Sequence, residues 1–274
     1  MPPRPLPPFV RAAVRAAVRA AVRSTLPLAL LVLPVGPTLP TRVALAQPPA
    51  AATHVPLAER PLRMAKDIEA FEAADRLAPP PKHAVLLSGA SSLRLWKDAG
   101  EALAPHPVIN RGFGGSYTTE VLGYMDRITL PYAPRVVVFH CGGNDIAAGD
   151  PPDAPIGRIR EYLARLRRAS PDTAVVFMAT TRAASRRAIW PALDRFNRDL
   201  AALCREERNI WFVDINAVLA VGVGEPRPNL YLDDKLHPSA WGYVAIAGVL
   251  KPAVDAAWRA TEAAFSGNGA APAP

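Results

Sequence analysis

Short apolar runs alternate with amphipathic segments along most of the chain after residue 60. The apolar runs are rich in Val, Ile, Leu and Phe and are too short to form solitary helices, so they predict buried strands. They occupy 84–88 (AVLLS), 107–109 (PVI, the weakest), 135–140 (RVVVFH), 174–179 (AVVFMA) and 210–215 (IWFVDI).

The segments between these runs have helical periodicity. The first of them places Met64, Ile68, Phe71 and Ala74 at helical spacing, with charged residues between them. The expected helices span 64–77, 92–103, 117–127, 156–168, 189–208 and 240–263. Strand–helix alternation is typical of a parallel sheet covered on both faces. We therefore expect one α/β domain with a doubly wound sheet over residues 61–263.

The first 46 residues have the order of features that an export signal requires. Five arginines between positions 4 and 23 precede a short apolar run at 26–35, and Ala44–Ala46 fits a cleavage site before Gln47. The run is shorter than the ~20 residues that a bilayer span needs, and prolines interrupt it. We expect an exported protein, periplasmic or extracellular, with no stable membrane span. The alternative is a cytoplasmic protein with a basic tail.

Composition limits the classes of protein that this chain can represent. Half of its 274 residues are hydrophobic, which argues against a disordered chain. The net charge of +8 falls to +2 without residues 1–46, which hold six arginines and no acidic residue, so nucleic-acid binding is not favoured. Cys141 and Cys204 are too few for a disulfide scaffold. Export would permit a bridge between them, but we expect two separately buried thiols. Residues 47–60 resemble a linker and 264–274 a frayed tail.

Polar residues that could take part in catalysis or binding concentrate in the loops after the predicted strands, where ligands bind in open α/β sheets. These loops are 89–92 (GASS), 110–116 (NRGFGGS), 142–145 (GGND), 180–182 (TTR) and, before the last helix, 233–238 (DDKLHP).

Ser91 and His237 are candidates for a nucleophile and its base. Ser91 follows a strand and begins a helix, so free N–H groups lie beside it; the alternative is an ordinary N-cap. Among the five histidines, His237 alone has a carboxylate three residues before it, Asp234, which would face the same side of a turn. In the alternative interpretation, Asp233 or Asp234 caps the last helix. His140, at a strand end, is interpreted as a buried polar residue.

Gly115 and Asn144 suggest an oxyanion hole, because a glycine-rich loop lets backbone approach a ligand and an Asn side chain offers two donors. Nucleotide binding is disfavoured, since GFGG is not G-x-G-x-x-G and no Walker lysine follows it. Neither cysteine has a partner at metal-ligand spacing. Arg182, Arg186 and Arg187 could meet an anionic or sugar substrate, with Arg182 the named candidate, although a solvated helix start is the favoured interpretation.

Taken together, these loops resemble the signature blocks of the SGNH (GDSL-type) hydrolase superfamily. The four blocks occur in the family order, each in the expected loop, within about 68–254. The first block departs from the usual G-D-S, because Ala90 replaces the acidic residue, and is closer to the G-S-S-S-I-R-x-W variant. The blocks are 89–96 (GASSLRLW), 110–116 (NRGFGGS), 142–145 (GGND) and 234–237 (DKLH).

The resemblance implies a three-layer, flavodoxin-like α/β/α sandwich with about five parallel strands. It also implies ester hydrolysis through an acyl-enzyme, without a metal or cofactor. Ser91 would be the nucleophile, His237 the base and Asp234 its orienting group. Ser91, Gly115 and Asn144 would form the oxyanion hole. Substrates in the superfamily include lipid acyl esters (lysophospholipase-like members), thioesters and sugar O-acetyl groups. A carbohydrate O-deacetylase is the alternative enzyme, and a non-catalytic binding module the alternative of another class.

Overall fold

The computed structural model of the protein describes residues 62–222 and 224–266. The expected signal at 1–46 and the expected linker at 47–60 lie outside the described residues. So do residues 267–274 of the expected tail, whereas 264–266 belong to the last helix. None of the helices in the described part of the chain combines the length and apolar character that crossing a bilayer requires.

Helices and strands alternate through the domain as the apolar pattern predicts. The helices are α2 (Ala65–Leu77), α3 (Ser91–Arg94), α4 (Ala99–Ala102), α5 (Thr118–Gly123), α6 (Met125–Ile128), α7 (Gly143–Ala147), α8 (Asp153–Ala169), α9 (Trp190–Glu206), α10 (Asn216–Leu219), α11 (Ala240–Ala260) and α12 (Glu262–Ser266). The strands are β1 (Val85–Gly89), β2 (Val108–Gly112), β3 (Val136–His140), β4 (Ala174–Met178), β5 (Ile210–Val213), β6 (Ala220–Val221) and β7 (Glu225–Pro226). Short 3₁₀ helices are η2 (Leu130–Tyr132), η3 (Ala184–Ile189) and η4 (Pro228–Leu230).

Within the described residues, the main sheet has five parallel strands in the order β2-β1-β3-β4-β5. The chain leaves β1 in one direction to form β2 and returns past it to form β3. The connections at the carboxyl ends of β1 and β3 therefore diverge, and a crevice opens between them, which is where ligands bind in doubly wound folds. Register places Gly89, the last residue of β1, beside Gly112 of β2 and His140 of β3.

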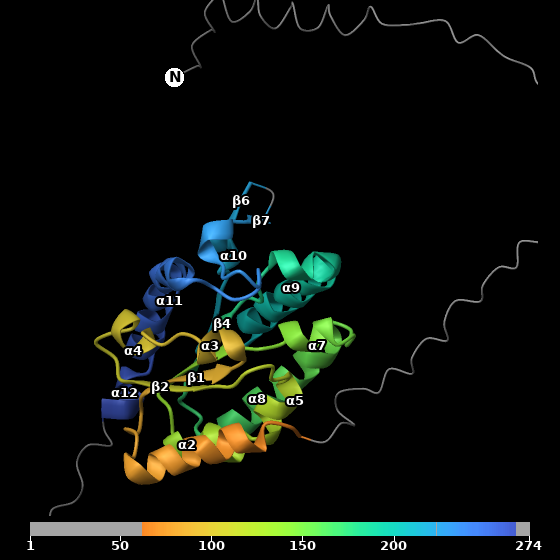
Figure 1. Ribbon diagram of the computed structural model, residues 1–274. Coiled ribbons are helices and arrows are strands. Elements are labelled where there is room, and N and C mark those ends of the chain that lie inside the picture. Colours follow the sequence, from red (N-terminus) through yellow and green to blue (C-terminus); the bar gives the residue numbers. More distant parts are fainter. Residues whose placement is uncertain (1–61, 223, 267–274) are drawn as a thin grey trace, which may run out of the picture. The chain divides into compact units, whose positions relative to one another are not determined.

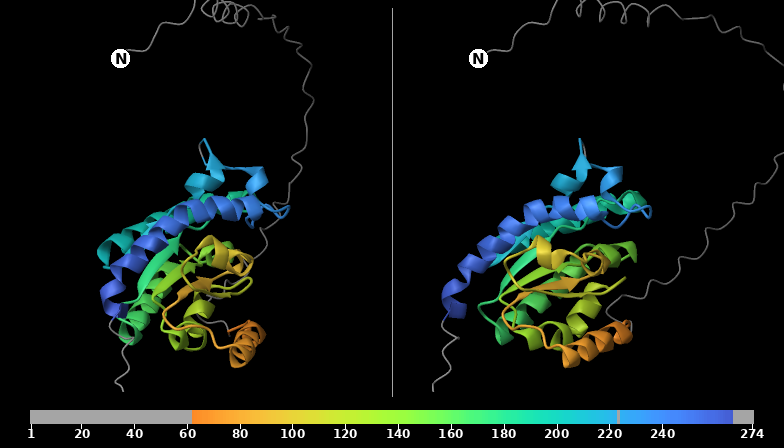
Figure 2. Two further views of the ribbon diagram at one scale, coloured as in Figure 1. Left: turned by 90° about the vertical axis from the view of Figure 1, so that its left-hand side faces the viewer. Right: turned by 60° about the vertical axis from the view of Figure 1, so that its left-hand side comes forward.

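Alternate strand residues supply two separate hydrophobic cores, one on each face of the sheet. Leu86, Val137 and Val175 face the layer that contains α2, α5, α6, α8 and α9. Val85, Val138 and Val176 face the layer that contains α3, α4, α10 and α11. Figures 1 and 2 show α11 and α2 on opposite sides of the sheet. The expected three-layer α/β/α sandwich is confirmed.

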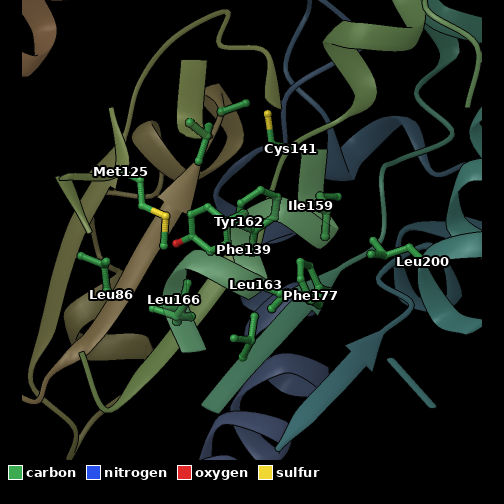
Figure 3. Packing of buried hydrophobic residues seen from close by; sticks show 14 of the residues in the cluster. Leu86, Met125, Phe139, Cys141, Ile159, Tyr162, Leu163, Leu166, Phe177 and Leu200 are labelled. Atoms are coloured by element: carbon green, nitrogen blue, oxygen red, sulfur yellow. The ribbon is translucent and has the colours of Figure 1, made fainter. Parts of the chain in front are cut away.

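Aromatic side chains fill the centre of the first core (Figure 3). The ring of Phe139 on β3 meets Tyr162 of α8 at 5.1 Å and Phe177 of β4 at 5.3 Å between centroids, both edge to face. Such pairs add about 0.5–1.5 kcal/mol beyond area burial. Cys141 borders the same core, and both Cys141 and Cys204 are buried free thiols, as expected. These contacts hold β3, whose carboxyl end enters the crevice, firmly in the sheet.

Some expected helices are divided. The helix predicted at 92–103 is two short helices, α3 and α4, because the intervening Trp96 is buried and stacks on Tyr243 of α11. The segment at 117–127 likewise forms α5 and α6, which meet at Tyr124. The sequence analysis did not predict α7 or the β6–β7 hairpin. In these places tertiary packing outweighs local periodicity.

Candidate active site

The crevice at the carboxyl ends of β1 and β3 collects residues from four of the predicted loops. A cavity of about 30 Å³ lies there. Ser91 begins α3, Asn144 lies on α7, and His237 lies in the loop before α11; all three line the cavity. Its other described lining residues are Ala90, Ser92, His140, Cys141, Gly143, Thr180, Thr181, Arg186 and Leu236.

Gly89 makes the turn that brings Ser91 into this cavity. It has a φ of +145°, which side-chain-bearing residues rarely adopt, and a Cβ at this position would lie 2.2 Å from the carbonyl oxygen of His140. The next amide, from Ala90, donates to that same carbonyl at 2.9 Å. The chain therefore turns tightly against the end of β3 before α3 begins. Ala90, not a serine, occupies the N-cap position of α3, so the N-cap interpretation of Ser91 is wrong.

Ser91, His237 and Asp234 form a continuous chain of hydrogen bonds. Nδ1 of His237 lies 2.6 Å from Oδ2 of Asp234, and Nε2 lies 2.7 Å from Oγ of Ser91. A carboxylate only accepts, so Nδ1 donates to it; Nε2 of a neutral ring then accepts from the Ser91 hydroxyl. An imidazole held in this way can take the hydroxyl proton.

Asp234 is held as a carboxylate by the loop that carries it. Its Oδ1 accepts from the amides of Leu236 at 2.9 Å and His237 at 3.0 Å. Partial burial by itself would raise the pKa of Asp234, but the hydrogen bonds from His237 and Leu236 outweigh it and lower the pKa to about 2. Ser239, whose hydroxyl accepts from the Gly242 amide, caps α11. The alternative that Asp233 or Asp234 caps this helix is therefore wrong.

Asn144 faces the cavity from α7 and is fixed at both ends of its carboxamide. Nδ2 donates to the carbonyl of Ser116 at 3.0 Å, and Oδ1 accepts from Nη2 of Arg186 at 2.5 Å. Gly115, at a φ of +69°, directly precedes Ser116, and its carbonyl accepts from Arg63. Gly115 is not among the described residues that line the cavity.

Asp145 anchors α7 to the neighbouring helices and was not singled out by the sequence analysis. Its fully buried carboxylate accepts from the backbone and hydroxyl of Thr118 and from Nη1 of Arg158 at 3.0 Å. Burial raises the pKa of Asp145, against the lowering effect of these hydrogen bonds. Asp145 thus ties α7 to α5 and α8. The sequence feature that could have identified Asp145 is its position in the GGND block, directly after the candidate donor Asn144.

His140 is the second histidine of the cavity, and its environment differs from that of His237. Burial, with the nearby Arg186 charge, lowers the pKa of His140 to about 4 against a hydrogen bond with the Met178 backbone. Its Nδ1 is buried and has no described hydrogen-bond partner. The interpretation of His140 as a buried polar residue is confirmed.

The three arginines after β4 separate in the structure. Arg182 forms an ion pair with Asp194 and lines a second cavity, of about 700 Å³, near the β6–β7 hairpin. Arg187 is exposed and pairs with Glu225. Arg186 instead enters the Ser91 cavity half-buried, so the interpretation of a solvated helix start is wrong for it. A substrate contact of Arg182 stays a prediction.

Comparison with known proteins places this geometry in a family. Residues 86–245 match the model of the GDSL-like Lipase/Acylhydrolase family. No curated protein matches the chain by sequence. Among solved structures, a Bacteroides fragilis protein assigned as an acylhydrolase is 21% identical, with a TM-score of 0.62 over 72% of this chain and 100% of that one.

Two further structures share the fold. A GDSL-like lipase from Bacteroides thetaiotaomicron is 22% identical, with a TM-score of 0.59 over 69% of this chain and 98% of that one. A variant of an acetyl-xylooligosaccharide esterase from Geobacillus is 16% identical, with a TM-score of 0.52 over 64% and 95%. The family match covers more than half of the chain and includes the segments of all four signature blocks. The chain therefore belongs to the GDSL-like lipase/acylhydrolase family of the SGNH hydrolase superfamily, and it is an enzyme that hydrolyses ester bonds.

Proposed function

We propose that the protein cleaves carboxylic esters through an acyl-enzyme on Ser91, with His237 as general base and Asp234 as its orienting group. The unbroken hydrogen-bond chain from Ser91 Oγ through His237 to Asp234 is the observation that carries this proposal. A serine hydroxyl is a weak nucleophile unless an adjacent base removes its proton.

The proposed reaction has two halves. Ser91 Oγ attacks the ester carbonyl while its proton passes to Nε2 of His237. Asp234, ionised down to about pH 2, stabilises the resulting imidazolium. His237 then gives the proton to the departing alcohol, which leaves an acyl group on Ser91. Water attacks this ester, with His237 again taking and returning one proton, and the carboxylic acid departs.

Three donors are proposed to bind the oxyanion that forms in each half. The Ser91 amide lies in the first turn of α3, where N–H groups have no intrahelical partner. The Gly115 amide and the second N–H of Asn144 Nδ2, which does not bind Ser116, complete the set. Donors fixed before reaction stabilise the developing charge without reorganisation.

The size of the cavity beside Ser91 favours a short acyl group. The cavity measures about 30 Å³, so we propose that it takes an acetyl group more readily than a fatty-acyl chain. A sugar O-deacetylase is therefore the second candidate, and the Geobacillus neighbour acts on acetyl-xylooligosaccharides. A lysophospholipase or thioesterase activity on long acyl groups is the less favoured alternative.

A fluorophosphonate and an ester series test these proposals. We expect the probe to label Ser91, and turnover of p-nitrophenyl esters to fall steeply from acetate to octanoate. Acetylated xylan, assayed beside them, tests the deacetylase alternative. Absence of any covalent adduct with the folded protein would contradict an acyl-enzyme on Ser91. Equal turnover of acetate and octanoate would refute the proposed acyl preference alone.

We also propose that the protein is exported, on the basis of the basic, apolar and small-residue order of residues 1–46. Sequencing the N-terminus of the protein recovered from cell fractions tests this. A mature chain that begins at Gln47 outside the cytoplasm is expected. A full-length chain confined to the cytoplasm would contradict the proposal.

A further inference from the structure

Arg186 has an unusual setting among the arginines after β4. Its guanidinium is half-buried beside Ser91, and its one described hydrogen bond from the side chain goes to Oδ1 of Asn144. Within 62–222 and 224–266, no carboxylate forms an ion pair with it, whereas Arg187, next in the chain, pairs with Glu225. Burying a guanidinium without a carboxylate partner costs free energy.

The contact determines which way the Asn144 carboxamide points. A guanidinium has only donors, so it binds Oδ1 and cannot bind Nδ2. The Ser116 carbonyl only accepts, so it binds Nδ2. Rotating the carboxamide by half a turn would break both hydrogen bonds. One N–H of Nδ2 is thereby taken by Ser116, and the other remains available to a ligand in the cavity.

The backbone around Arg186 is arranged to keep the guanidinium in place. A Cβ on Gly143 would lie 3.0 Å from Nη1 of Arg186, so the second glycine of the GGND block makes room for this group. On the same 3₁₀ helix η3, the amide and hydroxyl of Ser185 donate to the carbonyl of Lys235, between Asp234 and His237. Helix η3 thus contacts both the Asn144 side chain and the loop that carries His237.

We propose that Arg186 is a positioning residue of the oxyanion hole, which holds the Asn144 carboxamide with Nδ2 directed at the oxyanion. The positive charge of the guanidinium beside Oδ1 also polarises the amide and strengthens the remaining N–H as a donor. This inference rests on the proposed function, because it requires Asn144 to bind the oxyanion.

A double-mutant cycle with p-nitrophenyl acetate tests the proposal. Asn144→Ala is expected to lower kcat by about 10²–10³. Arg186→Met should lower kcat by at least about tenfold, but by no more than Asn144→Ala does, with little change in KM. Because Arg186 acts through Asn144, adding Arg186→Met to Asn144→Ala should change kcat by less than about twofold. Arg186→Lys, which keeps a donor and the charge, should recover part of the loss. Arg187→Met, the matched control, should behave as the wild type.

The outcomes separate this inference from the proposed function. Losses that multiply in the double variant, or a loss confined to KM, would overturn the positioning role, because a structural or substrate-binding arginine acts independently of Asn144. A normal kcat in Asn144→Ala would instead remove Asn144 from the oxyanion hole. If Arg186→Met does not fold, the cycle is run with Arg186→Lys, whose partial loss should likewise vanish beside Asn144→Ala. Labelling of Ser91 by fluorophosphonate counts the folded sites in each variant.

Discussion

Nε2 of His237 lies 2.7 Å from Oγ of Ser91, although 146 positions separate the two residues in the chain. Ser91 follows β1. His237 precedes α11, which packs over β4 and β5, and these two strands lie on the far side of β3 from β1 in the sheet. The pair therefore exists only when the α/β domain is folded. Substitutions within the pair should remove chemistry and leave the two hydrophobic cores intact.

Ser91→Ala should abolish turnover, whereas Ser92→Ala should retain substantial activity. Of these two serines, Ser91 has its hydroxyl hydrogen-bonded to His237. The backbone carbonyl of Ser92, which the substitution keeps, accepts from Tyr243. Initial rates with p-nitrophenyl acetate check this, with fluorophosphonate labelling as the control. Labelling at Ser92, or full labelling of the Ser91→Ala protein, would contradict the assignment.

His237→Ala should be as damaging as Ser91→Ala, and the double variant scarcely worse, because nucleophile and base act as one unit. Asp234→Asn should be less severe, since it mainly disturbs the tautomer and orientation of the ring. Measured kcat values across the variant series check this. An inactive His140→Ala beside an active His237→Ala would move the base to His140.

Asn144→Ala should lower kcat by about 10²–10³, roughly 3–4 kcal/mol, with little change in KM. The substrate carbonyl is neutral and the tetrahedral intermediate is charged, so loss of a donor falls on the transition state. The backbone donors should sustain some activity. Melting temperature and active-site titration measured beside the kinetics separate catalysis from folding. A normal kcat per titrated site would mean that Asn144 only braces the loop after β3.

Folding stability should fall on acidification from about pH 6.5 to pH 4.5 because of His140. The folded-state pKa of about 4 lies below the usual histidine value of 6.5, so in this window the unfolded chain binds a proton that the folded chain does not. The free energy of unfolding then decreases as pH falls, by up to about 1.4 kcal/mol per unit. The contribution of neutral His140 to the free energy of unfolding is fully present above pH 6.5 and is lost as the pH approaches 4.

Replacing His140 by Gln removes the titrating group and should flatten this dependence. Denaturant unfolding at several pH values gives the slope for each protein, and comparing slopes cancels any uniform loss of stability. The lowered pKa of Asp234 affects both proteins alike, so the comparison of slopes cancels its contribution. Identical slopes for wild type and His140→Gln would show that His140 is not the group responsible.

The sequence by itself determined the five strands of the main sheet and the main chemical candidates. Val, Ile and Phe runs encode buried parallel strands locally, and the short spacing from Asp234 to His237 lets one loop hold both groups. Ser91 could be identified because strand ends meet at one edge of a parallel sheet. The structure contains these strands and brings Ser91, His237 and Asp234 together, because each inference depends on neighbours in the chain or on a rule of the fold class.

Only the tertiary structure decided which arginine enters the site and where helices break. Arg182, Arg186 and Arg187 occupy similar sequence surroundings, yet Arg182 and Arg187 meet Asp194 and Glu225, and Arg186 meets Asn144. Likewise, α3 and α4 separate because Trp96 packs on a helix far along the chain. Such outcomes depend on which distant segments pack together, and periodicity within one segment carries no record of its distant partners.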